Sequence, residues 1–248
     1  MIDLIPSLNS FKPIALNEME SVNLMNRLDS KYVIPIKSLV DVINKIQSEY
    51  RILSINNNRL FTYDNIYFDT EDNKLYREHH NGKLTRFKFR VREYCESDQL
   101  YFELKLKNNK GKTDKKRIKT NSKNLCSTHI AFLNEFINLN ETYVPSLNVK
   151  FKRFTLVNNA KTERITFDTE LLYQCSRNSK MYDYFCIIEI KENGRSKSSF
   201  LRRTLREMRL NQSSISKYCF GMANINARNV KTNLLKEKFR NINKLANE

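Results

Sequence analysis

Glycine is scarce in this 248-residue chain, and its scarcity limits how the protein could bind phosphate. Its four glycines are too widely spaced to form a Walker loop or a Gly-x-Gly-x-x-Gly turn; they are Gly82, Gly111, Gly194 and Gly221. Both motifs cradle phosphate with backbone N–H groups. A phosphate site in this chain must therefore be built mainly from side chains.

Histidine and paired cysteines are also in short supply. Three histidines, His79, His80 and His129, give poor support to a His-rich zinc site or a serine-hydrolase triad. The five cysteines are an odd number, are widely spaced and include no Cys-x-x-Cys pair; they are Cys95, Cys126, Cys175, Cys186 and Cys219. This pattern predicts reduced, mostly buried thiols.

Long apolar runs are missing as well. The opening MIDLIPSLNSFKPI has no basic region followed by an apolar stretch, and no window approaches the roughly 18 apolar residues that span a bilayer. We therefore expect a soluble, cytoplasmic protein. Such a protein could still associate with a membrane complex through a membrane-protein partner.

Positive charge is abundant. The 44 Lys and Arg residues against 27 Asp and Glu give a formal net charge of +17, which repels itself unless a polyanion, an acidic partner or an anionic membrane offsets it. Nucleic acid, phosphorylated small molecules, polyphosphate and lipid headgroups all qualify as partners. Composition alone does not choose among them.

The hydrophobic period changes along the chain from helical to alternating and back. It predicts helices over residues 16–25, 36–50, 72–80, 124–136, 200–208 and 217–227. It predicts strands over 28–34, 65–70, 83–94, 99–107, 113–120, 148–157, 163–169 and 184–192. Strands clustered in mid-chain between helices indicate an α+β protein with one domain, 1–227. The basic segment 228–248 is expected to be a helical or frayed tail outside the core.

Charge alternates along neighbouring strands. One face of the strand over 83–94 carries Arg86, Lys88, Arg90 and Arg92, and its other face is apolar. The next two strands repeat the arrangement, with Glu103, Lys105 and Lys107, and then Lys115, Arg117 and Lys119. A single basic face is ordinarily a solvated one. Three such faces side by side would repel one another across the sheet, and a bound anion would relieve that repulsion.

One acid stands among the cations of the later strands. Lys152, Arg153 and Arg164 add positive charge, and Glu189 shares a strand face with Lys191. Glu189 is either a structural ion-pair partner or a ligand for a hard divalent metal that bridges to phosphate oxygens.

Closing these strands into an antiparallel β-barrel tunnel would place the apolar faces outward beneath flanking helices and the charged faces in the lumen. Burying so many charges without counter-ions would be prohibitive. The lumen must then stay hydrated or hold a polyanion.

Short motifs along the chain carry a family resemblance. They are RLDSKY at 27–32, YDNIYFDT at 63–70, FRVRE at 89–93, FELK at 102–105, KKR at 115–117, KRF at 152–154, RITFDTE at 164–170, IIEIK at 187–191 and SKY at 216–218. In this order and spacing the chain resembles the VTC domain, the polyphosphate-polymerase module of vacuolar transporter chaperone complexes and their bacterial relatives. That domain belongs to the triphosphate tunnel metalloenzyme (CYTH-like) superfamily. The resemblance runs from about residue 11 to 227.

The resemblance implies roles for the charged residues. Catalytic cations are expected at Arg90, Arg92, Arg153, Arg164 and Lys217. Substrate contacts are expected from Lys31, Lys88, Lys105, Lys115, Arg117, Lys191 and Ser216. Glu189 would hold Mn²⁺ or Mg²⁺, with Glu103 as a second acidic candidate.

Two positions depart from the superfamily pattern. Its first strand often carries Glu-x-Glu-x-Lys, whereas Arg27-x-Asp29-x-Lys31 keeps only the second acid and the lysine. Phe151 stands where a tyrosine is expected, so the ring is kept and a hydroxyl donor is lost.

The leading hypothesis is transfer of the terminal phosphate of ATP, or another triphosphate, to a polyphosphate chain. Positioned cations and metal stabilise the dispersed charge of that transition state, and arginine suits the task because it stays charged and binds phosphate through two nitrogens. Hydrolysis of inorganic triphosphate and non-catalytic binding of polyphosphate or inositol phosphates remain alternatives. Nucleic acid is not expected, because the strand cations alternate with aromatic residues on the opposite face, where bases could not stack beside the phosphates.

Overall fold

The structure is a computed structural model that describes residues 3–20, 27–176, 178–193, 199–213, 215–225 and 230–246, apart from the side chains of residues 20, 27 and 193. The helix expected over 16–25 appears within this range as α2, Leu16–Glu20. Residues 21–25 of that expectation lie outside the described residues.

Eleven strands form one sheet with the order β2-β11-β9-β8-β4-β5-β6-β7, with β1, β3 and β10 attached beside this path. All pairs are antiparallel except β1 with β3. The strands are β1 Lys12–Ile14, β2 Arg27–Pro35, β3 Tyr50–Leu53, β4 Phe61–Asp69, β5 Arg86–Tyr94, β6 Gln99–Lys107, β7 Thr113–Thr120, β8 Val144–Asn158, β9 Glu163–Cys175, β10 Asn178–Tyr182 and β11 Phe185–Asn193.

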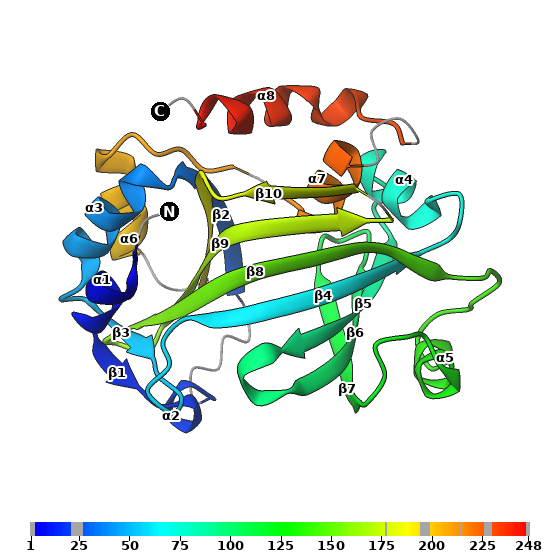
Figure 1. The fold of residues 1–248 in the computed structure, drawn as a ribbon, viewed down its shortest axis with the longest axis horizontal. Coiled ribbons are helices and arrows are strands. Elements are labelled where there is room, and N and C mark those ends of the chain that lie inside the picture. The colour runs from blue at the N-terminus through cyan, green and yellow to red at the C-terminus, as the bar shows by residue number, and fades with distance from the viewer. Residues whose placement is uncertain are drawn as a thin grey trace.

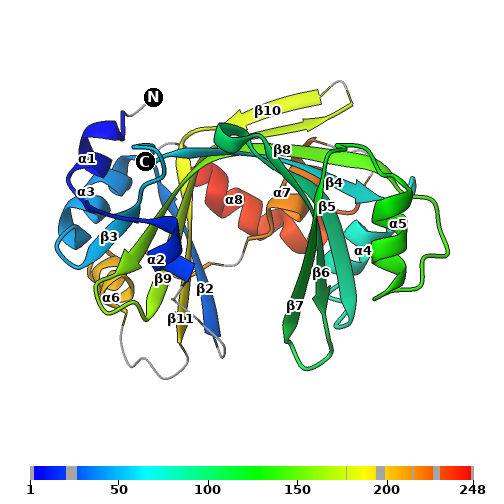
Figure 2. The same ribbon diagram turned by 90° about the horizontal axis from the view of Figure 1, so that it is seen from below.

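Helices lie on both sides of this sheet (Figures 1 and 2). Besides α2 they are α1 Ile5–Asn9, α3 Lys37–Ile46, α4 Lys74–His80, α5 Ser127–Asn134, α6 Phe200–Glu207, α7 Lys217–Ile225 and α8 Lys236–Lys244, with short 3₁₀ turns η1 Cys95–Ser97 and η2 Asn233–Leu235. In the described part of the chain, none of these helices has the length and apolar character needed to cross a membrane.

The sheet bends into an arch (Figure 2). Strands β8 and β4 form its floor, β9, β11 and β2 form what we call the first arm, and β5, β6 and β7 form the second arm. The α+β tunnel fold expected from the sequence is confirmed. The expected barrel closure is not: β2 and β7 end the sheet on opposite arms, and the described strands include no pair that joins them. The edge of β2 instead meets a returning segment, through a bridge from Tyr32 to Gln212 and a 2.8 Å bond from the Ser213 N–H to the Lys31 carbonyl.

Alternation along the strands places two apolar clusters outside the arch, as expected, while a third, which includes Phe151 and Phe220, lies on the hollow side next to α7 and α8. Behind the second arm, Phe89 and Phe102 pack with Leu133 of α5 in one apolar cluster. Behind the first arm, Phe167 and Ile188 pack in a second cluster, to which Leu39 and Val42 of α3 and Leu201 and Leu205 of α6 belong. Both charged strand faces are thereby turned toward the hollow of the arch.

The C-terminal segment corrects one expectation. It does form a helix, α8, but it does not lie outside the core, because Ile242 is only 5% exposed and belongs to an apolar cluster with Phe220 and Met222. Phe239 packs edge-on against Phe220, with ring centroids 5.4 Å apart. Leu235, Phe239 and Ile242 follow a helical period, and this stripe was hidden among the Lys, Asn and Glu residues of the tail.

Candidate functional site

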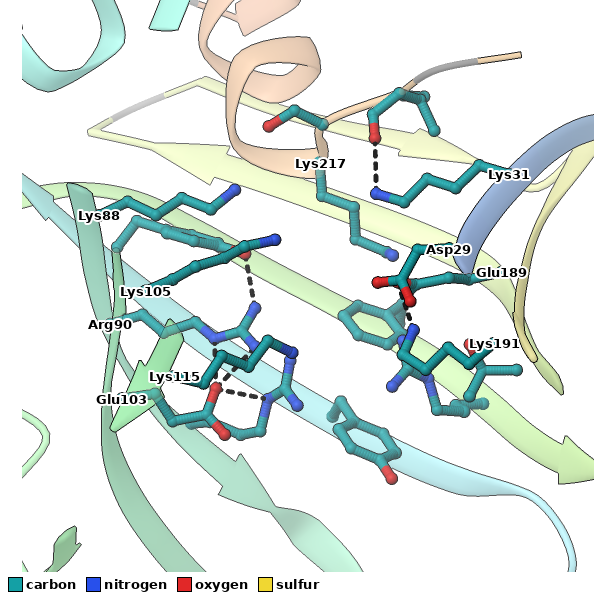
Figure 3. A pocket seen from close by; sticks show the side chains of 18 of the residues that line it. Asp29, Lys31, Lys88, Arg90, Glu103, Lys105, Lys115, Glu189, Lys191 and Lys217 are labelled. Atoms are coloured by element: carbon teal, nitrogen blue, oxygen red, sulfur yellow. Dashed lines mark hydrogen bonds and ion pairs between the residues drawn. The ribbon is translucent and has the colours of Figure 1, made fainter. Parts of the chain in front are cut away.

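The hollow of the arch encloses a cavity of about 1320 Å³. Every residue that the sequence marked as a site residue lines this cavity. The first arm and floor contribute Lys31, Arg153, Arg164, Glu189 and Lys191; the second arm contributes Lys88, Arg90, Arg92, Glu103, Lys105, Lys115 and Arg117; α7 and the residue before it contribute Lys217 and Ser216. The structure therefore brings the predicted residues together, while their roles stay predictions. Figure 3 shows side chains from the two arms reaching toward one another.

A buried carboxylate joins the floor to α7. Asp168 of β9 is the register partner of Arg153 of β8, and the Arg153 Nε and Nη2 atoms donate to its two carboxylate oxygens over 2.5 and 2.9 Å. The Lys217 Nζ donates to the same carboxylate, whose side chain is 1% exposed. Burial alone would raise the pKa of Asp168, but Arg153 and Lys217 lower it to about 2. Asp168 therefore stays ionised and holds two predicted catalytic cations in place.

The position of Lys217 depends on how α7 packs. Gly221 of α7 lies so close to β9 that a Cβ there would overlap the ring of Tyr173. The hydroxyl of Tyr218 donates to Asp69, a buried carboxylate that also accepts from the backbone N–H groups of Leu75 and Tyr76 in α4. The Ser216 hydroxyl accepts from the Cys219 N–H over 3.4 Å at the start of the helix. These contacts fix the first turn of α7 against the cavity.

Glu189 lies in the middle of the first arm. Its carboxylate pairs with Lys191, and across the strand pair its register partner is Lys31 of β2. Burial opposes ionisation, but Lys191 and Lys31 hold the pKa of Glu189 well below its ordinary value. Lys31 in turn donates to the Ile215 carbonyl over 3.1 Å, so the segment before α7 is attached to this arm.

The surroundings of Glu189 suit a hard divalent cation. Asp29 of β2 is the register partner of Lys191, so its carboxylate lies beside that of Glu189 on the same arm (Figure 3). Mg²⁺ and Mn²⁺ are commonly held by one or two carboxylates together with water and substrate phosphates. Within the described residues no group of three or more His, Cys, Asp and Glu side chains could hold a metal unaided. A metal here would thus depend on phosphate oxygens for the rest of its ligands.

Glu103, the second predicted metal ligand, lies on the opposite arm. Its Oε2 accepts from Arg90 Nε and Nη2 over 2.9 and 2.7 Å and lies 3.8 Å from Arg92 Nε. Burial raises its pKa, but Arg90 and Arg92 lower it to about 2. Tyr67 accepts from Arg90 Nη1 over 2.7 Å, and Asn65 accepts from Arg92 Nε over 2.8 Å. The structure does not bring Glu103 and Glu189 together, and Glu103 orients two arginines.

The lysines of the second arm differ from these paired groups. Lys88, Lys105 and Lys115 point into the hollow (Figure 3), and in the described part of the chain no ion pair joins them to a carboxylate. Removal from water, followed by neighbouring cations, lowers the pKa of Lys88 and Lys105 to about 8 and that of Lys115 to about 7. Three ammonium groups gathered without a paired acid form a site that attracts an anion.

Sequence reasoning missed Asp168. The residue stands two positions after Thr166 and four after Arg164, and strand alternation places all three on one face. That alternation could have identified Asp168 as a site residue, but the charge pattern singled out only cations on this strand. Asn65 orients Arg92 and Tyr67 orients Arg90. Alternation along β4 also predicts that Asn65 and Tyr67 share one face of that strand.

Comparison with family models matches the VTC domain over residues 26–226. This span covers most of the chain, and the protein belongs to the VTC domain family, as its motifs predicted. Comparison with curated proteins found no match.

Several solved structures resemble the chain at low identity. A candidate adenylate cyclase from Vibrio parahaemolyticus has a TM-score of 0.47 at 12% identity, covering 77% of this chain and 94% of its own. PH1819 protein from Pyrococcus horikoshii OT3 has a TM-score of 0.46 at 12% identity, and the match covers 78% of this chain and 97% of that protein. HpAC1 from Hippeastrum is described as a candidate adenylyl cyclase with a dominant triphosphatase activity. It has a TM-score of 0.47 at 12% identity, and the match covers 80% of this chain and 96% of that protein. These values describe a likeness in chain trace alone.

Proposed function

We propose that this protein transfers the terminal phosphate of ATP, or another triphosphate, to a polyphosphate chain in the hollow of the arch, with Mn²⁺ or Mg²⁺ bound at Glu189. Membership of the VTC domain family supports phosphoryl transfer of this kind. The expected membrane-protein partner stays a prediction.

The observation that carries the proposal is that one cavity contains both carboxylates paired with cations and lysines without a paired carboxylate. The first arm presents carboxylates already matched to cations, and the second arm presents lysines without paired carboxylates among the described residues. A metal-bound polyphosphate needs both, since its metal seeks carboxylate oxygen and its phosphate oxygens seek cations.

The residues divide the chemistry as follows. Arg90, Arg92 and Arg153 are oriented by Glu103, Asn65 and Asp168, so their guanidinium groups are set before substrate arrives. Preorganised cations of this kind stabilise charge that spreads over the transferring phosphoryl group. Lys217, held by Asp168 beside Arg153, and Lys31, held by the Ile215 carbonyl, add further positive charge. A metal at Glu189, with Asp29 beside it, would neutralise phosphate oxygens.

The test is to incubate the purified protein with ATP and Mn²⁺ and to analyse the products on gels and by phosphorus NMR. We expect polyphosphate to accumulate, and Glu189→Gln to reduce its formation by about 100-fold because one metal-holding carboxylate is lost. Glu207→Gln, at an exposed position of α6, is the matched control and should leave the rate unchanged.

Other outcomes would replace the proposal. Release of phosphate without polymer would make the protein a triphosphatase. Tight, salt-sensitive binding of polyphosphate with no turnover would make it a binding module. Equal activity of Glu189→Gln and wild type would remove Glu189 from the mechanism.

A further inference from the structure

A belt of aromatic rings crosses the cavity near the end of β5 that lies next to η1. Phe151 of β8, Tyr63 of β4, Tyr94 of β5 and Tyr101 of β6 all line the cavity. Phe151 and Tyr63 are register partners with parallel rings 5.4 Å apart, and Tyr63 and Tyr94 are register partners with centroids 5.0 Å apart. Tyr94 and Tyr101 meet edge to face at 5.8 Å. Four neighbouring strands thus place rings on the cation side of the sheet.

This belt changes one conclusion from the sequence. Strand alternation predicts that aromatic rings and cations lie on opposite faces of the sheet, but here guanidinium groups lie over the rings. Arg92 and Arg153 lie 5.2 and 4.9 Å from the centre of Tyr63, and Arg117 lies 4.8 Å from that of Tyr101. A ligand with both phosphates and a flat ring could therefore contact both kinds of side chain at once.

Exposure of the rings rises along the belt. Phe151 and Tyr63 are 2% and 9% exposed, whereas Tyr94 and Tyr101 are only partly buried. Two uncharged polar residues that lie between these outer rings in the chain, Ser97 and Gln99, also line the cavity, and the Tyr101 hydroxyl donates to the Gln99 side-chain carbonyl over 3.2 Å. Amides and hydroxyls beside an accessible ring suit the edge and face of a nucleobase better than they suit phosphate.

The opposite end of the cavity has a different lining. Leu235, Phe239 and Ile242 of the C-terminal segment line it there, and the cations Arg86, Lys88 and Lys107 stand nearby. Phe239 and Ile242 pack against the core rather than offering a free ring face. The two ends thus differ in the chemistry they present, and the Tyr94 end is the one suited to a base.

We propose that Tyr94 and Tyr101 form a subsite for the base of a nucleoside triphosphate, whose phosphates extend inward past Arg117 and Arg92. Arg92 is the register partner of Tyr101, so a phosphate bound there lies next to the base subsite. The inference rests on the proposed function for its triphosphate. It adds which side chains contact the base of a nucleotide donor, and that this base enters from the Tyr94 end.

The test uses the fluorescent analogue ethenoadenosine triphosphate and inorganic tripolyphosphate as probes. Stacking on an aromatic side chain contributes about 5- to 150-fold in affinity per base. We expect Tyr101→Ala to weaken binding of the analogue at least about fivefold relative to its effect on tripolyphosphate, and to abolish the change in analogue emission on binding. Tyr101→Phe, which keeps the ring, should restore both.

Tyr143→Ala is the matched control, because Tyr143 is half-buried, packs against Phe89 on the outer side of the sheet and does not line this cavity. The base subsite would be overturned if Tyr101→Ala weakened the binding of both probes equally, or if it weakened the binding of neither probe. Since this is a binding measurement, it remains decisive even if the protein makes no polyphosphate. Loss of binding of both probes to the wild type would instead refute the proposed function and the subsite with it.

Discussion

The two arms of the arch solve the same electrostatic problem in different ways. On the first arm and the adjoining floor, Lys191 pairs with Glu189, and Arg153 and Lys217 pair with Asp168. On the second arm, Glu103 serves Arg90 and Arg92, and within the described residues Lys88, Lys105 and Lys115 have no paired carboxylate. One arm is neutralised by the chain itself, and the other is left to be neutralised by a ligand.

The difference teaches what each arm can do. Paired cations are rigid and keep their geometry without substrate, which suits residues that must stabilise a transition state. Unpaired lysines repel one another and so destabilise the protein without ligand. A bound anion removes this repulsion, which strengthens its binding. We infer that the first arm sets geometry and the second arm supplies affinity for polyanions.

The largest expected effect comes from breaking the paired arm at Asp168. Asp168→Asn leaves Arg153 and Lys217 buried without their counter-charge, which typically costs about 3–5 kcal/mol in the free energy of unfolding. Urea denaturation measures the loss. Asp114→Asn is the control, because Asp114 on β7 is 60% exposed and should change stability by less than about 0.5 kcal/mol. Equal midpoints for the two variants would show that Asp168 does not stabilise this arm.

A smaller effect of opposite sign is expected on the second arm. Lys88→Met or Lys105→Met removes an unpaired ammonium from the cavity, so the empty protein should gain stability, raising its Tm by about 2–4 °C. The same variants should bind tripolyphosphate more weakly. Lys45→Met, at an exposed site on α3, should change neither quantity. A lower Tm in the cavity variants would mean that these lysines have partners in the empty protein.

The pH dependence of stability sharpens this prediction. Lys88 and Lys105 have pKa values of about 8 in the folded protein against an ordinary 10.5. Between these values the unfolded chain binds more protons than the folded one, so stability of the empty protein should rise as pH increases from 8 to 10.5. Binding of tripolyphosphate needs the charged forms and should weaken over the same window. Lys115 has a lower pKa, about 7, so its contribution to this rise should begin at lower pH.

Much of this comparison was readable from sequence, because strand alternation fixes which side chains share a face. Arg86, Lys88, Arg90 and Arg92 were placed correctly on that basis alone. The ion pairs that distinguish the first arm from the second could not be predicted from the sequence. Arg153 contacts Asp168 through the cross-strand register, and Lys217 contacts Asp168 from a helix 49 residues further along the chain. The open edge between β2 and β7 likewise depends on Gln212 and Ser213 returning to β2, which no local pattern encodes.

The smallest expected effect is a spectroscopic one at His79, which lines the cavity near the start of the second arm. Burial, followed by Lys88 and Arg86, lowers its pKa to about 3, so the ring stays neutral in the empty protein. A bound anion would offset those cations, and the pKa should then rise toward the ordinary 6.5. Proton NMR can follow this, because the chain has three histidines and His79→Gln identifies the resonance. A pKa that stays near 3 when tripolyphosphate is bound would place the anion away from the second arm and remove the distinction between the arms.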